Sequence, residues 1–111
     1  MEKDDQLDAA FSALAHPARR AILAQLAQGT ASVNALAEPF DMTLPAVSKH
    51  IRVLEKAGLI SREKDAQFRL CKLETAPLQE IASWTDMYRG IWEARFDTME
   101  TLLAGMKGSN Q

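Results

Sequence analysis

The residues best equipped for chemistry lie between positions 43 and 57, where cationic and hydroxyl side chains recur at helical spacing. At about 100° per residue, Ser48, Lys49, Arg52 and Lys56 fall on one side of a helix. The other side is mostly apolar. Hydroxyl and cationic groups hydrogen-bond base edges and neutralise phosphates, so this face suits a polyanion such as DNA. A solvated charged face is the alternative that this segment alone leaves open.

A helix of this kind reads DNA with its first residues, which meet base edges in the major groove. Ser48 and Lys49 can reach base acceptors, whereas Leu44 and Ala46 can touch a thymine methyl group. Cations further along the helix are better placed for phosphates. A strand pair after the helix supplies three more cations as a second clamp. The predicted DNA-binding residues are Thr43, Leu44, Pro45, Ala46, Ser48, Lys49, Arg52, Lys56, Arg62, Lys64 and Arg69.

The charge distribution favours a nucleic acid over a merely solvated face. Residues 43–72 carry seven basic side chains against three acidic ones, whereas residues 1–42 and 73–111 each carry three basic against six acidic. The net charge of -2 therefore hides a basic centre between two acidic flanks. Such a distribution directs one face towards a polyanion while the remainder repels it.

Helices with apolar stripes position the candidate DNA-binding face. Apolar residues recur at helical spacing over residues 4–15 and 17–26. Ser32 and Thr43 can cap two further helices by accepting hydrogen bonds from backbone N–H groups. The short helix, the turn and the longer helix that follow form a predicted helix-turn-helix at about residues 32–57.

A change of pattern after residue 58 predicts a β-hairpin. Residues 59–63 and 68–73 have the alternation of strands, and residues 64–67 connect them. The helical period then returns. The predicted fold is mainly α with a β-hairpin, a winged helix-turn-helix with terminal dimerisation helices. It forms one domain over residues 1–111, with the helix-turn-helix at about 32–57, the wing at about 59–73 and the dimerisation helices at about 4–15 and 76–106.

The last predicted helix carries a wide apolar face. Trp84, Tyr88, Trp92 and Phe96 follow one another at intervals of four, and apolar side chains cover about half of the circumference. Residues 76–106 would span roughly 46 Å, which exceeds the diameter of about 35 Å expected for this domain. A two-fold homodimer would bury the excess, with a predicted interface of Leu7, Phe11, Ile81, Trp84, Tyr88, Trp92, Phe96, Met99 and Leu103. An aromatic pocket for a small organic effector at the same interface is the alternative.

Three stretches carry a resemblance to a known family: HPARRAIL at 16–23, ASVNALAEPFDMTLPAVSKHIRVLEKAGLISRE at 31–63 and FRLCKL at 68–73. The chain resembles the ArsR/SmtB family of winged-helix transcriptional repressors. Its tail PLQEIASW…RFDTMETLL is similar to a branch of the family without metal sites. The resemblance implies a sequence-specific repressor that binds palindromic operator DNA as a homodimer and releases it on an inducing signal. A helical protein–protein adaptor without DNA binding is the alternative from another class.

The sequence departs from the metal- and thiol-sensing members of that family. Those metal sensors place ligands on the third and last helices, but residues 32–38 and 74–111 contain neither cysteine nor histidine. Thiol-based sensors need two cysteines, and Cys71 is the only one here. The wing tip carries Ala66 and Gln67 where the family usually has Gly-Arg. We therefore expect no metal and no cofactor, and no arginine contact from the wing tip.

The remaining reactive side chains have structural interpretations. Cys71 lies on a predicted strand and is expected to be packed and unreactive. His50 falls on the apolar side of the fourth helix, and His16 precedes Pro17 at a helix junction that it would order. No Gly-x-Ser-x-Gly motif occurs and no nucleophile has a local base, so we expect no enzymatic activity. The acidic start and the lack of a long apolar run predict a cytoplasmic protein.

Overall fold

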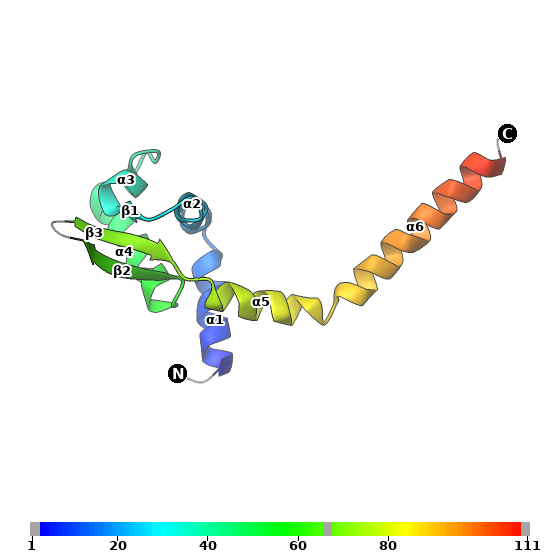
Figure 1. Ribbon diagram of the computed structural model, residues 1–111, viewed down its shortest axis with the longest axis horizontal. Coiled ribbons are helices and arrows are strands. Elements are labelled where there is room, and N and C mark those ends of the chain that lie inside the picture. Colours follow the sequence, from blue (N-terminus) through cyan, green and yellow to red (C-terminus); the bar gives the residue numbers. More distant parts are fainter. Residues whose placement is uncertain (1–2, 66–67, 110–111) are drawn as a thin grey trace. The chain divides into compact units, whose positions relative to one another are not determined.

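The computed structural model describes residues 3–65 and 68–109 and divides the chain into two compact units, residues 1–81 and 82–111. The fold is mostly helical with a small antiparallel sheet, which confirms the predicted fold class (Figure 1). The elements are α1 (Lys3–Leu14), α2 (Pro17–Leu26), β1 (Ala31–Ser32), α3 (Val33–Ala37), α4 (Leu44–Lys56), β2 (Ile60–Asp65), β3 (Phe68–Leu73), α5 (Ala76–Asp86) and α6 (Arg89–Ser109).

The sheet has one strand more than the predicted hairpin. Its order is β1-β3-β2, and both pairings are antiparallel. Ala31 and Ser32 of β1 lie opposite Cys71 and Leu70 of β3. A two-residue strand is too short for the alternation by which strands are predicted, which explains why the sequence pattern did not reveal it. β1 ties the start of the helix-turn-helix to the wing.

The core of the first unit combines the apolar faces of the helix-turn-helix with the start of the wing. Ile51 and Leu54 of α4 are fully buried, together with Ile22 of α2, Leu36 of α3 and Leu59. Burial of one such side chain contributes roughly 1.5–3 kcal/mol. The apolar side of α4 is therefore fixed against the domain, and its polar side faces outwards.

Capping residues set both ends of the helix-turn-helix. Ser32 Oγ accepts a hydrogen bond from the N–H of Ala35 at 3.2 Å, and Thr43 Oγ1 accepts one from the N–H of Ala46 at 3.3 Å. Both predicted N-caps are thus confirmed, and α3 and α4 fall within the predicted residues 32–57. Each cap typically stabilises its helix by about 1 kcal/mol.

The end of α4 leads directly into the wing. Gly58 has a φ of +78°, a left-handed conformation that glycine adopts without steric cost. The N–H of Gly58 donates to Glu55 O at 3.0 Å, and the N–H of Leu59 donates to Leu54 O at 2.9 Å. This is a Schellman motif, in which buried Leu54 and Leu59 supply the accompanying apolar contact. The motif fixes where the chain leaves α4 and enters β2.

The predicted continuous helix over residues 76–106 is wrong. α5 ends at Asp86 and α6 begins at Arg89. Between them, the N–H groups of Met87 and Tyr88 donate to carbonyls three residues earlier, the tight bonding of a helix terminus. An ion pair of 2.8 Å between Arg89 Nε and Asp86 Oδ1 spans the break. The apolar periodicity continues through the break, so the pattern concealed it.

Candidate DNA-binding surface

The two faces of α4 differ as the sequence predicted. Val47, Ile51 and Leu54 are buried, whereas Lys49, Arg52 and Lys56 are exposed on the other side. Ser48 lies between these faces and is half-buried. The three cations therefore stand on a helix whose orientation is fixed by the core beneath it. A groove-reading helix requires this arrangement, because rigid support keeps side chains in register with base pairs.

The first turn of α4 presents small and apolar groups to solvent. Leu44 is 46% exposed, although its spacing also placed it on the apolar side of the helix. Pro45 is exposed next to it, and Ala46 is half-buried. Thr43 directs its hydroxyl to the backbone as the cap of the helix. This end of the helix therefore offers an apolar contact of the kind that a thymine methyl group accepts.

A charged groove lies between α4 and the wing. It is lined by Arg52 and Glu55 of α4, Arg62 and Glu63 of β2, and Arg69 of β3. Three guanidinium groups against two carboxylates leave the groove positive, which favours the phosphate backbone of DNA. The structure thus brings three of the predicted DNA-binding cations into one groove.

These three arginines differ in their availability. Arg62 Nε lies 3.5 Å from Glu55 Oε2, and the Arg62 side chain is only 26% exposed. Arg52 and Arg69 are exposed. The side chain of Lys64, and the wing-tip residues Ala66 and Gln67, lie outside the described residues. Of the two clamp cations whose side chains the structure describes, Arg69 is therefore the accessible one, while Glu55 offsets the charge of Arg62.

His16 and Arg19, at the N-terminus of α2, both contact His50 of α4. Arg19 Nε donates a hydrogen bond to His50 Nδ1 at 3.2 Å, and Arg19 also donates to Ser12 O at 3.4 Å. The rings of His16 and His50 lie 4.4 Å apart between centroids. The structure thus confirms His50 as a satisfied boundary residue, one position after Lys49. Sequence reasoning missed Arg19 as its partner because 31 positions separate the two residues.

The protonation state of His50 is tied to this contact. Partial burial lowers the pKa of His50, and the positive charges of His16, Arg19 and Lys49 lower it further. His50 Nδ1 can accept from Arg19 only when that nitrogen carries no proton. The neutral imidazole is therefore the form that joins α2 to α4.

The structure also tests the predictions made for His16 and Cys71. His16 accepts a hydrogen bond from the N–H of Ala18 at 3.2 Å and is the N-cap of α2, which confirms its role at the junction. Cys71 is fully buried, as expected for a packed thiol. Burial raises the pKa of the Cys71 thiol and outweighs the opposing effect of Arg62. Within residues 3–65 and 68–109, no group of three or more potential ligands is arranged to hold a metal ion.

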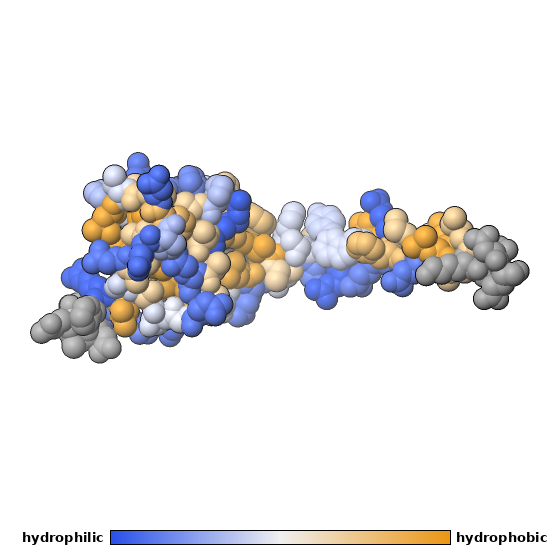
Figure 2. All heavy atoms as spheres, turned by 90° about the horizontal axis from the view of Figure 1, so that it is seen from above, coloured by the Kyte–Doolittle hydropathy of each residue, from blue (hydrophilic) through white to orange (hydrophobic). Residues whose placement is uncertain are grey.

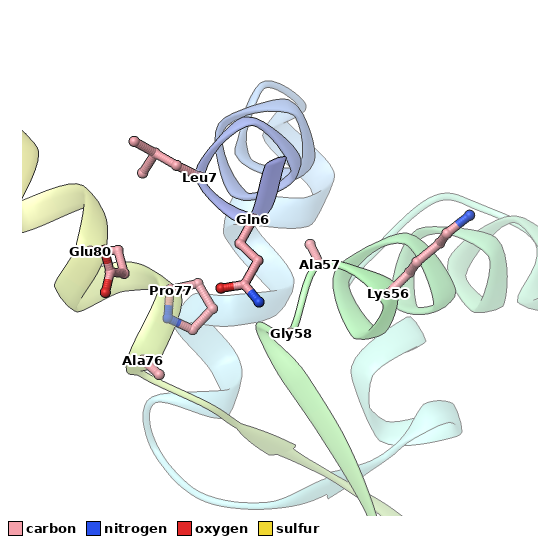
Figure 3. A pocket seen from close by; sticks show the side chains of 8 residues that line it. All are labelled: Gln6, Leu7, Lys56, Ala57, Gly58, Ala76, Pro77 and Glu80. Atoms are coloured by element: carbon pink, nitrogen blue, oxygen red, sulfur yellow. The ribbon is translucent and has the colours of Figure 1, made fainter. Parts of the chain in front are cut away.

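A shallow pocket of about 360 Å³ lies beside the end of α4 (Figure 3). Leu7, Ala57 and Pro77 give it apolar walls, and Figure 3 shows the Gln6 amide directed towards Pro77. The remaining lining residues are Lys56, Gly58, Ala76 and Glu80. None of the aromatic residues of the predicted effector site lines this pocket, so the two sites are different.

The predicted dimer residues are distributed over both units. Leu7, Phe11 and Ile81 belong to the first unit; Leu7 and Ile81 are half-buried and Phe11 is exposed. Trp84 and Tyr88 have ring centroids 5.3 Å apart. Together with Trp92, Phe96, Met99 and Leu103, these two aromatic residues are exposed in the second unit. Within the described chain, no helix is long and apolar enough to cross a membrane.

Comparison with known proteins places this surface in a family. Residues 14–63 match the model of a helix-turn-helix domain. The transcriptional repressor SdpR of Bacillus subtilis is 35% identical over 74 residues, 67% of this chain and 82% of that protein. A crystal structure of an ArsR family transcriptional regulator has a TM-score of 0.74 and 41% identity, covering 83% of this chain and 95% of the other.

A third relative has been solved as a dimer. It is the homodimeric winged helix-turn-helix DNA-binding domain of a possible ArsR-family regulator from Mycobacterium bovis, with a TM-score of 0.61 and 25% identity over 77% of this chain and 84% of the other. The capped α3–α4 pair and its wing define a winged helix-turn-helix transcriptional regulator. Within that class, the chain belongs to the ArsR/SmtB family, which confirms the resemblance found in the sequence.

Proposed function

We propose that this chain is a homodimeric cytoplasmic repressor that binds a palindromic operator through α4 and the wing. The observation that carries the proposal is the outward face of α4, where Lys49, Arg52 and Lys56 are exposed above a fully buried apolar side. The proposed DNA-contacting residues are Thr43, Leu44, Pro45, Ala46, Ser48, Lys49, Arg52, Lys56, Arg62, Lys64 and Arg69.

The contacts divide into those that read bases and those that position the protein. Lys49 and Ser48, near the start of α4, would meet base edges, with Leu44 beside a thymine methyl group. Arg52 and Arg69, exposed at the groove between α4 and the wing, would hold phosphates on either side of the reading helix. All of these residues belong to the single domain that we propose for residues 1–111.

A symmetric dimer would present two such surfaces to two half-sites. The two recognition helices of such a dimer bind successive major grooves about 34–36 Å apart, which is why the operator is expected to be a palindrome. The homodimeric relative from Mycobacterium bovis supports this assembly. The proposed interface consists of Leu7, Phe11, Ile81, Trp84, Tyr88, Trp92, Phe96, Met99 and Leu103.

The proposed inducing signal is an organic molecule rather than a metal ion. The exposed aromatic side chains of Trp84 and Tyr88 support this class of effector, because planar apolar ligands pack on aromatic rings. Cys71 and the two histidines do not form a metal-binding group among the described residues.

Selection of bound sequences from a random duplex pool tests the proposal. We expect the purified protein to enrich a palindrome whose half-sites are centred about 10 base pairs apart, and to bind it more weakly as salt is raised. The variant Arg89→Ala, which removes one exposed cation outside the proposed surface, should select the same palindrome. Recovery of no common sequence, with affinity no greater than for random duplex, would contradict sequence-specific binding.

A further inference from the structure

α6 carries a repeat of its own, which the break before Arg89 separates from Trp84 of α5. Large apolar residues follow one another in α6 at alternating intervals of four and three. This is the a/d spacing of a two-stranded coiled coil. The seam consists of Trp92, Phe96, Met99, Leu103 and Met106, with exposures from 42% to 63%. Figure 2 shows apolar side chains exposed along this part of the chain.

The a/d spacing fits a partner helix that carries the same spacing, because each a or d side chain then inserts between four residues of the facing helix. A second copy of this chain offers an identical seam of identical length. The 21 residues of α6 make three heptads, enough for five layers of apolar side chains.

The charges that flank the seam distinguish the two possible orientations. With Trp92 at a d position, Arg95 takes the g position and Glu93 and Glu100 take e positions. In a parallel pair, a g residue lies beside the e residue five positions later in the other helix, so Arg95 meets Glu100 of the second copy. Symmetry gives this attraction twice. Within the described chain no ion pair engages Arg95 or Glu100, and both are exposed.

An antiparallel pair would place like charges together. In such a pair, e positions face e positions, and two registers align the seam along most of its length. In one of them Glu100 faces Glu93 of the second copy, and in the other it faces Glu100. Carboxylates opposite each other repel, so both registers are disfavoured relative to the parallel one.

We propose that the α6 helices of two copies pair as a parallel, in-register coiled coil along the seam from Trp92 to Met106, with Arg95 of each copy bound to Glu100 of the other. This rests on the proposed homodimer and specifies its second unit. The coiled coil joins the two chains through residues of the second unit, whereas the proposed DNA-contacting residues all belong to the first.

Reversal of one charge tests the orientation in the full chain. In the parallel coil, Glu100→Arg sets two arginines against each other at two places and weakens dimerisation about tenfold at low salt. The double variant Arg95→Glu/Glu100→Arg restores the pairs and the parent affinity. In one antiparallel register Glu100→Arg turns a repulsion into an attraction, and in the other it replaces two facing carboxylates by two facing arginines. Tighter or unchanged dimerisation in sedimentation therefore overturns the proposal. Asp97→Arg, the same charge change away from the seam, is the control.

Cysteine crosslinking tests the register independently. In the parallel coil, Leu103→Cys brings two thiols together and oxidation links nearly all of the dimer, whereas Thr101→Cys, on the outer face of the same turn, links little. An antiparallel pair would place residue 103 near residue 92 or residue 99 of the second copy, depending on the register, so the two introduced thiols would not lie opposite each other. The parent protein, with only buried Cys71, measures the background.

The outcomes separate this proposal from the proposed function. A dimer that binds its operator but does not crosslink at position 103 overturns the parallel coil and leaves the repressor intact. A parent protein that remains monomeric at micromolar concentration overturns both the coil and the proposed homodimer.

Discussion

Arg52→Ala should flatten the salt dependence of operator binding. Arg52 is exposed on α4 at the mouth of the groove between α4 and the wing, and no ion pair within the described residues offsets its charge. Arg52 is therefore well placed to neutralise a phosphate. Each neutralised phosphate contributes about -0.9 to the slope of log K against log salt concentration, and the dimer carries two copies of Arg52.

The expected change in slope is about 1.8, since two phosphate contacts are lost. If the parent and variant curves meet near 1 M salt, the same change corresponds to roughly 60-fold weaker binding at 0.1 M salt. Fluorescence anisotropy of a labelled operator between about 50 and 400 mM salt measures both quantities. Arg89→Ala removes a cation from α6 and should leave the slope as it is in the parent.

The slope distinguishes a phosphate contact from a merely structural role. A variant that binds more weakly but keeps the parent slope would show that Arg52 does not neutralise a phosphate. A variant that binds as tightly as the parent, with an unchanged slope, would refute the placement of α4 against DNA. Thermal unfolding of the variant confirms that its fold is intact, because the exposed Arg52 side chain contributes little to the core.

Three further predictions address the reading helix, the α2–α4 contact and the dimer. Lys49→Ala should cost roughly 1–3 kcal/mol at one operator position and relax the preference there, which selection on a randomised position measures. Because the pKa of His50 is lowered in the folded state, the unfolded chain binds the proton more readily; stability should fall as pH drops below about 6.5. His50→Gln keeps an acceptor for Arg19 and should reduce this dependence in urea titrations at pH 7 and 5. Trp92→Asp should dissociate the dimer, as measured by sedimentation, because dimerisation would bury an unpaired carboxylate between the two α6 helices. If the variant stays dimeric, Trp92 does not lie in the interface.

A fifth prediction concerns the signal. Zinc, cadmium or arsenite at modest excess should leave operator affinity unchanged, because the sequence holds one cysteine and two histidines, and His16 and His50 are engaged with α2. Cys71→Ser should bind DNA like the parent under oxidant, since the thiol is fully buried. Loss of DNA binding with metal, abolished by changing Cys71 or a histidine, would contradict this expectation.

The helix-turn-helix could be predicted from the sequence because its determinants are local. Ser32 and Thr43 cap the next turn of their own chain, and the apolar stripe of α4 is read within 13 residues. Gly58 likewise ends α4 through a local conformation. The outward face, with Lys49 and Arg52, then follows from helix geometry alone.

The features that escaped prediction depend on contacts between distant residues or on a few backbone bonds. The hydrogen bond from Arg19 to His50 joins two helices, and β1 is only two residues long. The break at residues 87–88 lies inside an uninterrupted apolar pattern, so periodicity could not detect it. Glu55 offsets the charge of Arg62 only because α4 and β2 are packed side by side. A list of basic residues gives Arg62 and Arg69 equal weight.

The break before α6 changes how the dimer should be understood. A single rod over residues 76–106 would join Trp84 and the apolar residues of α6 into one interface, whereas the structure divides them between two helices. The α6 seam can then hold two chains together while each reading unit engages its own half-site. Such a linkage makes the second half-site contact intramolecular and raises overall affinity without any new contact to DNA. Substitutions in α6 that abolish pairing should therefore weaken palindrome binding far more than binding to an isolated half-site, although α6 itself contributes none of the proposed DNA-contacting residues.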